Sequence, residues 1–451
     1  MNNTQELPVA VIGAGPVGLA AAAHLAERAI PFVVLEAGDQ AGAAIAQWGH
    51  VRLFSPWRHN IDRAARDLLR TTGWTEPDPR YLPTGAELVT GYLEPLAAHP
   101  AIAPALRVGA RVEAISRLGY DRVRSHGREH APFVLRVRAE DGTVSELTAR
   151  AVIDASGTWL TPNTLGATGL PAHGETGATE LIISALPDVL GADRDRFVNR
   201  HTVVLGAGHS ATTTLLALAA LAHTAPRTTV TWAIRAGDAN RAYGGGAADA
   251  LPARGAIGTR VRELVRAGRI QLITGFFTHT VHPRPDGVDL VSQDPAGVEQ
   301  KLGADLVVNA TGFRPDHTIA AELRLDLDPI LGATRALAPL IDPNIHSCGT
   351  VPPHGVDELA HPEPGYHAIG VKSYGRAPTF LLATGYEQAR SVVAALAGDW
   401  AAARDVQLEL PETGVCSTNL TPARPGHGLA TGISGGLLAT PLLDTTSACC
   451  G

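Results

Sequence analysis

The chain is poor in the features on which small secreted proteins and membrane proteins depend. It has four cysteines in 451 residues, too few for a disulfide framework in a chain of this size. No uninterrupted apolar segment is long enough to span a bilayer. No basic region precedes the first apolar run, so no secretory signal is expected. A cytoplasmic protein without a membrane partner is therefore the expectation.

Basic clusters and metal-ligand patterns are also missing. The formal net charge is −7 and no Lys/Arg cluster occurs, which argues against nucleic acid or an anionic membrane as a partner. The 18 histidines fall into no helical metal-binding pattern, so no metal site is expected. The chain is long enough for two or three domains with substantial cores.

The most informative motif present is a glycine-rich fingerprint, GAGPVG, at Gly13–Gly18. It follows the apolar run Val9–Ile12 and opens an Ala/Leu-rich helical stretch, Pro16–Ala29. In such a strand–turn–helix, the first glycine makes the tight turn and the second lets backbone N–H groups approach a diphosphate. The third position must be small so that helix and strand pack closely. The candidate cofactor-binding residues of this turn are Gly13, Gly15, Pro16 and Gly18.

An acidic residue completes the first fingerprint. The next expected strand, Phe32–Leu35, ends at Glu36. A carboxylate at this position can accept both hydroxyls of an unphosphorylated adenosine ribose, as in FAD or NAD.

A second fingerprint, GAGHSA, occupies Gly206–Ala211 between the apolar run Thr202–Leu205 and the helical stretch Ser210–His223. Its next strand, Thr229–Ile234, ends in Arg235 instead of an acid. A guanidinium there suits a ribose 2′-phosphate, which favours NADPH over NADH. The alternative is a solvated surface arginine. Two such sites indicate two dinucleotides and electron transfer between them.

Two similar buried runs, Ala151–Gly157 and Asp305–Gly312, flank the second fingerprint. They predict crossings between two domains of an α/β protein: a Rossmann-like FAD domain with an inserted Rossmann-like NADPH domain. The expected FAD domain comprises residues 1–164 and 305–400, and the NADPH domain residues 165–304. Residues 401–451, rich in Gly, Thr and Pro, are expected to form a flexible tail.

The order of the motifs over residues 7–400 resembles the order found in a known protein family. GAGPVG with Glu36 is followed by Trp48, Ser55-Pro56-Trp57, ASGTW at Ala155–Trp159, GAGHSA, Arg235 and ATGFRPD at Ala310–Asp316. This series resembles the two-dinucleotide-binding flavoproteins, particularly the flavin-containing and Baeyer–Villiger monooxygenases. The Phe-x-Gly-x-x-x-His linker of that group is not found at His173–Ala185, which makes oxygen insertion less secure than NADPH oxidation.

The resemblance implies the chemistry and further site residues. NADPH would reduce FAD, and a C4a-peroxyflavin would insert oxygen into a small soft-nucleophile or carbonyl substrate. The partners would be that small molecule and molecular oxygen, with a homodimer left open. Further cofactor-binding candidates are Trp48, Trp57, Gly157, Gly206, Gly208, His209, Ser210, Thr311, Gly312 and Gly349. Catalytic candidates near the flavin are Asn60, Asp62 and Arg58, for which helix capping is the alternative.

The cysteines support a competing hypothesis. The chain ends in Cys449-Cys450-Gly451, which is similar to the terminal dithiols of mercuric reductase and the large thioredoxin reductases. With Cys416, these thiols could form a thiophilic site for a metalloid. Those reductases also carry a cysteine pair beside the flavin, in Cys-x-x-Cys or Cys-x4-Cys spacing, and this chain has neither. An NADPH-dependent flavin reductase or oxidase, or a thiol- or metalloid-handling flavoprotein, remains the alternative.

Overall fold

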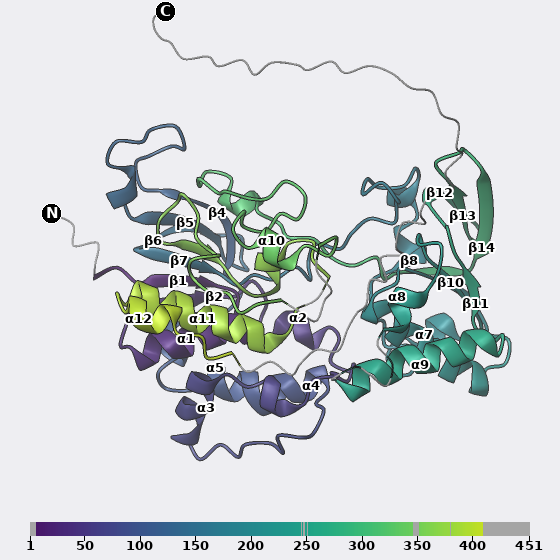
Figure 1. The fold of residues 1–451 in the computed structure, drawn as a ribbon, viewed down its shortest axis with the longest axis horizontal. Helices are drawn as coiled ribbons and strands as arrows, with labels where there is room; N and C mark the ends of the chain where they lie inside the picture. Colours follow the sequence, from purple (N-terminus) through teal and green to yellow (C-terminus); the bar gives the residue numbers. More distant parts are fainter. Residues whose placement is uncertain are drawn as a thin grey trace, which may run out of the picture. The chain divides into compact units, whose positions relative to one another are not determined.

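The structure is a computed structural model that describes residues 6–408 except 245, 247, 248, 250, 346–350 and 379. Two lobes of this region share one three-layer plan (Figure 1). In each lobe a five-stranded parallel sheet has helices on one face and a three-stranded antiparallel sheet on the other. The α/β fold with two dinucleotide-binding lobes, expected from the sequence, is confirmed.

The first lobe is built on a parallel sheet with strand order β16-β7-β1-β2-β3. The strands are β1 (Val9–Ile12), β2 (Phe32–Leu35), β3 (Leu106–Arg107), β7 (Ala151–Asp154) and β16 (Tyr366–Ala368). The helices are α1 (Pro16–Glu27), α3 (Arg63–Arg70), α11 (Leu382–Leu396) and α12 (Trp400–Arg404). The antiparallel layer is β4 (Arg111–Arg117), β5 (Phe133–Arg138) and β6 (Val144–Ala149).

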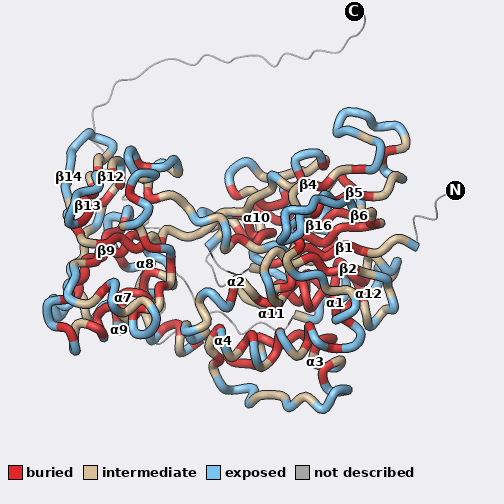
Figure 2. Tube along the Cα trace, turned by 180° about the vertical axis from the view of Figure 1, so that it is seen from behind, coloured by how far each residue is buried: buried red, intermediate tan, exposed pale blue. Residues whose placement is uncertain are grey.

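The side chains of β1 alternate between two hydrophobic cores, one on each face of the sheet. Val9 and Val11 pack with α1, α3 and α11, whereas Ala10 and Ile12 pack with β4, β5 and β6. Successive side chains of a strand point to opposite faces, so a strand buried on both sides is apolar throughout. Both parallel sheets are accordingly buried in Figure 2.

The second lobe repeats the plan with strand order β11-β10-β9-β15-β8. Its parallel strands are β8 (Ile182–Ile183), β9 (His201–Leu205), β10 (Thr229–Ala233), β11 (Gln271–Ile273) and β15 (Leu306–Asn309). The main helices are α7 (His209–Thr224) and α9 (Pro252–Arg266), and the antiparallel layer is β12 (Thr278–Arg284), β13 (Gly287–Gln293) and β14 (Glu299–Ala304).

Two expected boundaries differ from the structure. Strand β15 pairs with β9 and β8, so the boundary set at residue 305 falls before a strand that belongs to the second lobe. Helix α12 packs on α11, where the Ser391 hydroxyl donates to the carbonyl of Ala403 at 2.6 Å. The expected tail therefore begins too early at residue 401, because the packed structure continues beyond that residue. Residues 409–451 lie outside the described residues.

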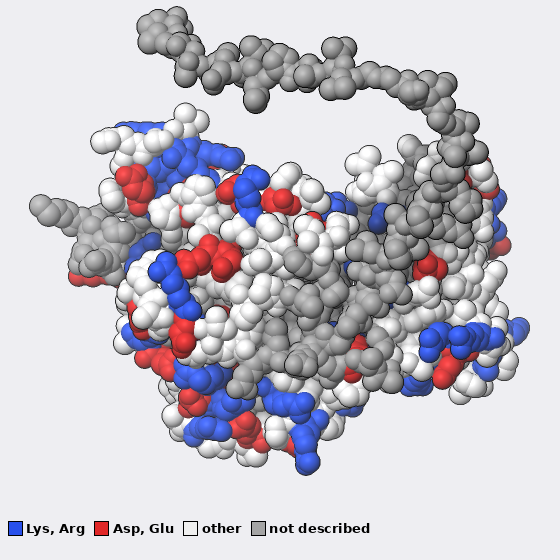
Figure 3. Space-filling view, in the orientation of Figure 1, with Lys and Arg blue, Asp and Glu red and all other residues white. Residues whose placement is uncertain are grey.

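Several short helices connect the layers. They are α2 (Ala43–Ala46), α4 (Gly85–Leu88), α5 (Glu94–Ala97), α6 (Arg194–Phe197), α8 (Asn240–Tyr243) and α10 (Ala338–Ile341). Among the described residues, no helix has the length and apolar character needed to cross a bilayer. On the face shown in Figure 3, acidic and basic side chains are interspersed.

Candidate functional site

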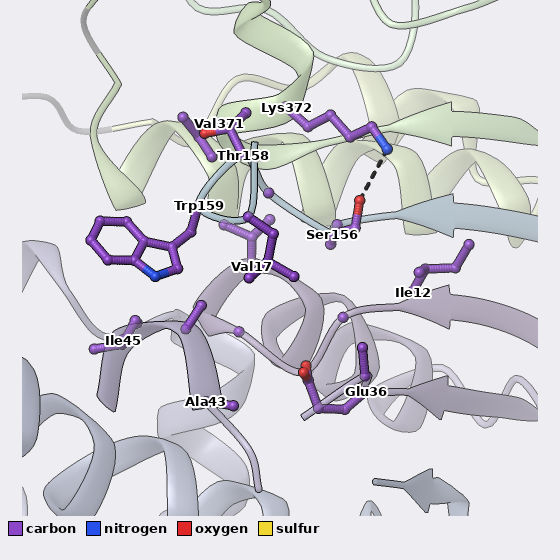
Figure 4. Close-up of a pocket in the computed structure, with 18 of the residues that line it drawn as sticks. Ile12, Val17, Glu36, Ala43, Ile45, Ser156, Thr158, Trp159, Val371 and Lys372 are labelled. Carbon is purple, nitrogen blue, oxygen red and sulfur yellow. Dashed lines mark hydrogen bonds between the residues drawn. The ribbon is translucent and has the colours of Figure 1, made fainter. Parts of the chain in front are cut away.

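A cavity of about 670 Å³ opens at the carboxyl ends of β1, β2 and β7 in the first lobe (Figure 4). This end of a parallel sheet is where open α/β folds bind ligands. Six of the expected cofactor-binding residues line the cavity: Gly13, Gly15, Pro16, Glu36, Trp48 and Gly157.

The three glycines of the first fingerprint have different packing environments. Gly13 has φ +97°, and a Cβ there would lie 2.7 Å from the carbonyl oxygen of Ala155. A Cβ on Gly18 would lie 1.9 Å from the carbonyl oxygen of Gly13. A Cβ on Gly15 would have no described heavy atom within 4 Å. Protein packing therefore requires the first and third glycines, whereas the second faces open space.

This open space has the properties of a diphosphate site. Gly15 is the N-cap of α1 and lines the cavity, and as a glycine it has no side chain with which to cap the helix. The first backbone N–H groups of a helix lack partners within the helix and carry partial positive charge. The turn thus offers room and donors where a dinucleotide diphosphate would lie.

Glu36 fits the ribose of the same cofactor. Its Oε2 accepts the N–H of Ala14 at 2.7 Å, and its Oε1 accepts the N–H of Gly38 at 2.8 Å. These bonds fix the carboxylate against the turn. Each carboxylate oxygen can accept a further hydrogen bond, so both remain able to bind ribose hydroxyls.

Aromatic rings form one wall of the cavity. The ring centroids of Trp159 and Phe313 are 5.0 Å apart, and those of Trp159 and Trp48 are 6.4 Å apart. The Trp159 indole donates to Oε1 of Gln47 at 2.8 Å, which fixes the ring. Rings held in this way offer faces for planar groups and exclude water.

The second fingerprint has the same geometry as the first. Gly206 has φ +124°, and a Cβ there would lie 2.0 Å from the carbonyl oxygen of Ala310. A Cβ on Gly208, the N-cap of α7, would have no described heavy atom within 4 Å. His209 and Ser210 begin α7, so the N–H groups of this helix also face an open turn.

Other predicted residues lie around the second turn. The His209 ring is 5.1 Å from the Phe54 ring, measured between centroids. Arg235 is exposed just after β10 and donates through Nη1 to the carbonyl of Ala167 at 3.0 Å. Its guanidinium has further N–H donors for a phosphate.

Among the expected cofactor-binding residues that do not line the cavity are Trp57, Thr311 and Gly312. Trp57 is 3 % exposed and belongs to the first core. The carbonyl of Thr311 accepts the side-chain N–H of Asn163 at 3.0 Å, and the carbonyl of Gly312 accepts the backbone N–H of Asn163 at 2.9 Å. These polar contacts join the two segments that cross between the lobes, so Thr311 and Gly312 support the crossing.

The three catalytic candidates also lie away from the cavity lining. Asn60 is fully buried and bonds to Ser55 through both ends of its amide. Asp62 is the N-cap of α3, where its side chain accepts the N–H of Ala65 at 3.0 Å. The Arg58 Nε donates to His59. The capping alternative is confirmed for Asp62, and the expected approach of all three to the main cavity is not seen.

Asp62 also forms a buried ion pair that has a pH consequence. Its Oδ2 lies 3.2 Å from Nε2 of His24. Burial alone would lower the pKa of His24, but Asp62 and Glu27 outweigh it and raise the pKa from 6.5 to about 9. We expect this pair to stabilise the fold fully below pH 6.5 and to lose its contribution as pH rises from 6.5 to 9. The loss is on the order of 3 kcal/mol in the free energy of unfolding.

Thermal unfolding of the wild type and of Asp62→Asn across pH 6.5–9 measures this loss. The wild type should lose stability on the alkaline side and the variant should lose much less. Parallel profiles would contradict the assignment.

Sequence reasoning missed residues at the far side of the cavity. Strand β16 is followed by Gly370 and by Lys372, which lies in the 3-10 helix η10 (Gly370–Tyr374); both residues line the cavity. The expected late-strand glycine was Gly349, which lies outside the described residues. The signal that could have found the pair is a glycine after a short apolar strand shortly before the last long helix. Cys416, Cys449 and Cys450 also lie outside the described residues.

This chain is similar to a known protein family and to a known enzyme. Residues 10–330 match the family model described as pyridine nucleotide-disulphide oxidoreductase. The indole-3-pyruvate monooxygenase YUCCA1 of Oryza sativa subsp. japonica is 39% identical over 129 residues, which are 26% of this chain and 28% of that protein. The match therefore spans little more than a quarter of that relative.

Solved structures share the fold. The bacillithiol disulfide reductase Bdr (YpdA) from Bacillus cereus superposes with a TM-score of 0.63 at 18% identity, covering 87% of this chain and 99% of that chain. The cadaverine monooxygenase DfoA from Erwinia amylovora, solved with FAD, gives 0.61 at 14% identity, covering 91% and 97%. The ornithine N-hydroxylase KtzI from Kutzneria, solved with reduced FAD and NADP⁺, gives 0.57 at 17% identity, covering 86% and 99%.

Proposed function

The chain belongs to the pyridine nucleotide-disulphide oxidoreductase family, and from this we propose that it is an FAD- and NADPH-dependent monooxygenase of a small carbonyl or soft-nucleophile substrate. One observation carries the proposal. In each fingerprint the first glycine, Gly13 or Gly206, is packed against protein, and the second, Gly15 or Gly208, faces open space at a helix N-terminus. Two such turns support two dinucleotides in one chain.

The residues of the first lobe would hold FAD. The α1 turn at Gly15 would bind the diphosphate, and Glu36 would bind the adenosine ribose. When bound, the two cofactors supply hydride transfer and oxygen activation. The wall of Trp48, Trp159 and Phe313 would exclude water and give a planar substrate an apolar surface.

Oxygen transfer is favoured over disulfide reduction by two observations. No Cys-x-x-Cys or Cys-x4-Cys pair occurs in the sequence, so the thiols that reduce disulfides beside a flavin are lacking. The aromatic wall instead suits a planar carbonyl compound. The indole-3-pyruvate monooxygenase that matches part of this chain is named for such a substrate.

The fate of oxygen tests the reaction type. NADPH consumption, hydrogen peroxide release and product should be measured with candidate carbonyl and sulfide compounds under ¹⁸O₂. A monooxygenase should place one ¹⁸O atom in the product and release less than one peroxide per NADPH. Peroxide equal to NADPH for every compound would indicate an oxidase, and NADPH consumption that oxygen does not affect would indicate a reductase.

Arg235 is expected to select NADPH over NADH. Its exposed guanidinium follows β10, where the ribose 2′-phosphate of a dinucleotide on the second turn would lie. Arg235→Ala should raise the KM for NADPH by roughly tenfold or more, because charge-assisted hydrogen bonds contribute about 1.5–3 kcal/mol. The KM for NADH should change little, and equal changes for both cofactors would contradict the assignment.

A further inference from the structure

A buried lysine lies beside the cavity of the first lobe. The ammonium of Lys372 is 2.6 Å from Oδ2 of Asp154 and 3.0 Å from Oγ of Ser156 (Figure 4 shows the contact with Ser156). Lys372 is 1 % exposed and Asp154 is fully buried. Removing two charges from water is unfavourable unless their geometry and remaining hydrogen bonds compensate.

The carboxylate of Asp154 accepts hydrogen bonds from several donors. Besides Lys372, its Oδ2 accepts the hydroxyl of Tyr366 at 3.0 Å. Its Oδ1 accepts both the hydroxyl and the N–H of Ser156. Burial by itself would raise the pKa of Asp154, but Lys372 and the two donors of Ser156 outweigh it and lower the pKa. Lys372 is therefore the charged partner of Asp154, and neutral donors from Tyr366 and Ser156 complete its hydrogen bonding.

The same cluster adjoins the first glycine turn. A Cβ on Gly13 would lie 3.2 Å from the Cα of Ser156, so the residue that Lys372 contacts packs against this turn. Lys372 and Arg111 are the basic residues among the described cavity lining, and Arg111 is exposed. An ammonium has three N–H donors, and two have acceptors within the described protein.

The choice of lysine at this position is itself informative. The chain has 37 basic residues but only two lysines, Lys301 and Lys372, so the other 35 (37 minus 2) are arginines. Almost all other basic residues of this chain are arginines, yet this buried position has the compact ammonium group of a lysine. A compact cation fits beside a closely packed glycine turn, where a planar guanidinium needs more room.

We propose that Lys372, positioned by Asp154, is the buried cation that balances the diphosphate of the flavin cofactor and sets its retention. The inference rests on the proposed FAD site. The third N–H of the ammonium donates to the diphosphate, and Asp154 and Ser156 hold the ammonium beside the glycine turn. Tyr366 and Ser156 hold Asp154 in position.

Two measurements test the proposal. Apoprotein is titrated with FAD for the wild type, Lys372→Met, the double variant Asp154→Asn/Lys372→Met and, as a control, Lys301→Met. Lys301 is an exposed lysine paired with Asp289. Lys372→Met and the double variant should bind FAD roughly tenfold or more weakly, which is the size of one lost charge-assisted hydrogen bond. Lys301→Met should bind as the wild type does.

The second measurement needs no variant to bind cofactor. Wild-type apoprotein labelled with ¹³C at lysine Cε gives two NMR signals, and that of Lys301 is assigned by its loss in Lys301→Met. Saturation with inorganic pyrophosphate should shift the Lys372 signal and leave that of Lys301 in place. Unchanged FAD affinity in the folded Lys372 variants, or an unmoved Lys372 signal, overturns the proposal. Wild-type apoprotein that binds no FAD would instead overturn the proposed function.

Discussion

Gly15→Ala is expected to weaken FAD binding without destabilising the apoprotein, whereas Gly18→Ala should destabilise the fold itself. The reason is the environment of each Cβ: none of the described atoms lies within 4 Å at Gly15, while the carbonyl oxygen of Gly13 lies 1.9 Å away at Gly18. In the proposed FAD site, the diphosphate would approach the backbone in the empty space at Gly15. Overpacking there costs about 1–3 kcal/mol, or roughly 5- to 150-fold in the dissociation constant for FAD.

The measurement is thermal unfolding of both apoproteins together with FAD titration. Gly15→Ala should unfold at the wild-type temperature and bind FAD weakly. Gly18→Ala should lose about 3 kcal/mol or more of stability, because its steric conflict is with backbone that cannot rotate away. A Gly15 variant that binds FAD normally would mean that no diphosphate lies against this turn.

The second fingerprint should respond in the same way toward NADPH. A Cβ on Gly208 has no described neighbour within 4 Å, whereas one on Gly206 would lie 2.0 Å from the carbonyl oxygen of Ala310 at φ +124°. Gly208→Ala should therefore keep its fold and its FAD but raise the KM for NADPH by roughly 5- to 150-fold. Gly206→Ala should destabilise the second lobe, since an L-residue is strained at that φ.

Steady-state kinetics of the yellow Gly208→Ala protein provide the check. Its flavin spectrum and FAD content should match those of the wild type, and its rate at very high NADPH should recover. A Gly208 variant with the wild-type KM for NADPH would contradict the binding of a second dinucleotide at this turn.

The sequence predicted the parts of the molecule that local patterns determine. The strands β1 and β2, the helices α1 and α7, and the glycine turns depend on residues close together in the chain, so periodicity and turn chemistry were sufficient. Strand β15 was given to the wrong lobe because its partners, β9 and β8, are distant in sequence. Pairing between distant strands leaves no local signal.

The site was predictable where a motif has a fixed spacing. Glu36 follows the first turn at such a spacing and lines the cavity as expected. Lys372 and Asp154 are 218 residues apart in the sequence, so the local sequence around either residue does not predict their contact. Asp62 shows the opposite error: a polar residue near the expected flavin position caps a helix and pairs with His24.

The claim that one chain aligns two dinucleotides for electron transfer is tested most directly by anaerobic flavin reduction in the two cavity-facing glycine variants. NADPH should bleach the wild-type flavin rapidly. At low NADPH, the flavin of Gly208→Ala should stay yellow until dithionite is added, and Gly15→Ala should be isolated with little flavin to reduce. Two variants that retain FAD and are bleached by NADPH as fast as the wild type would contradict the claim.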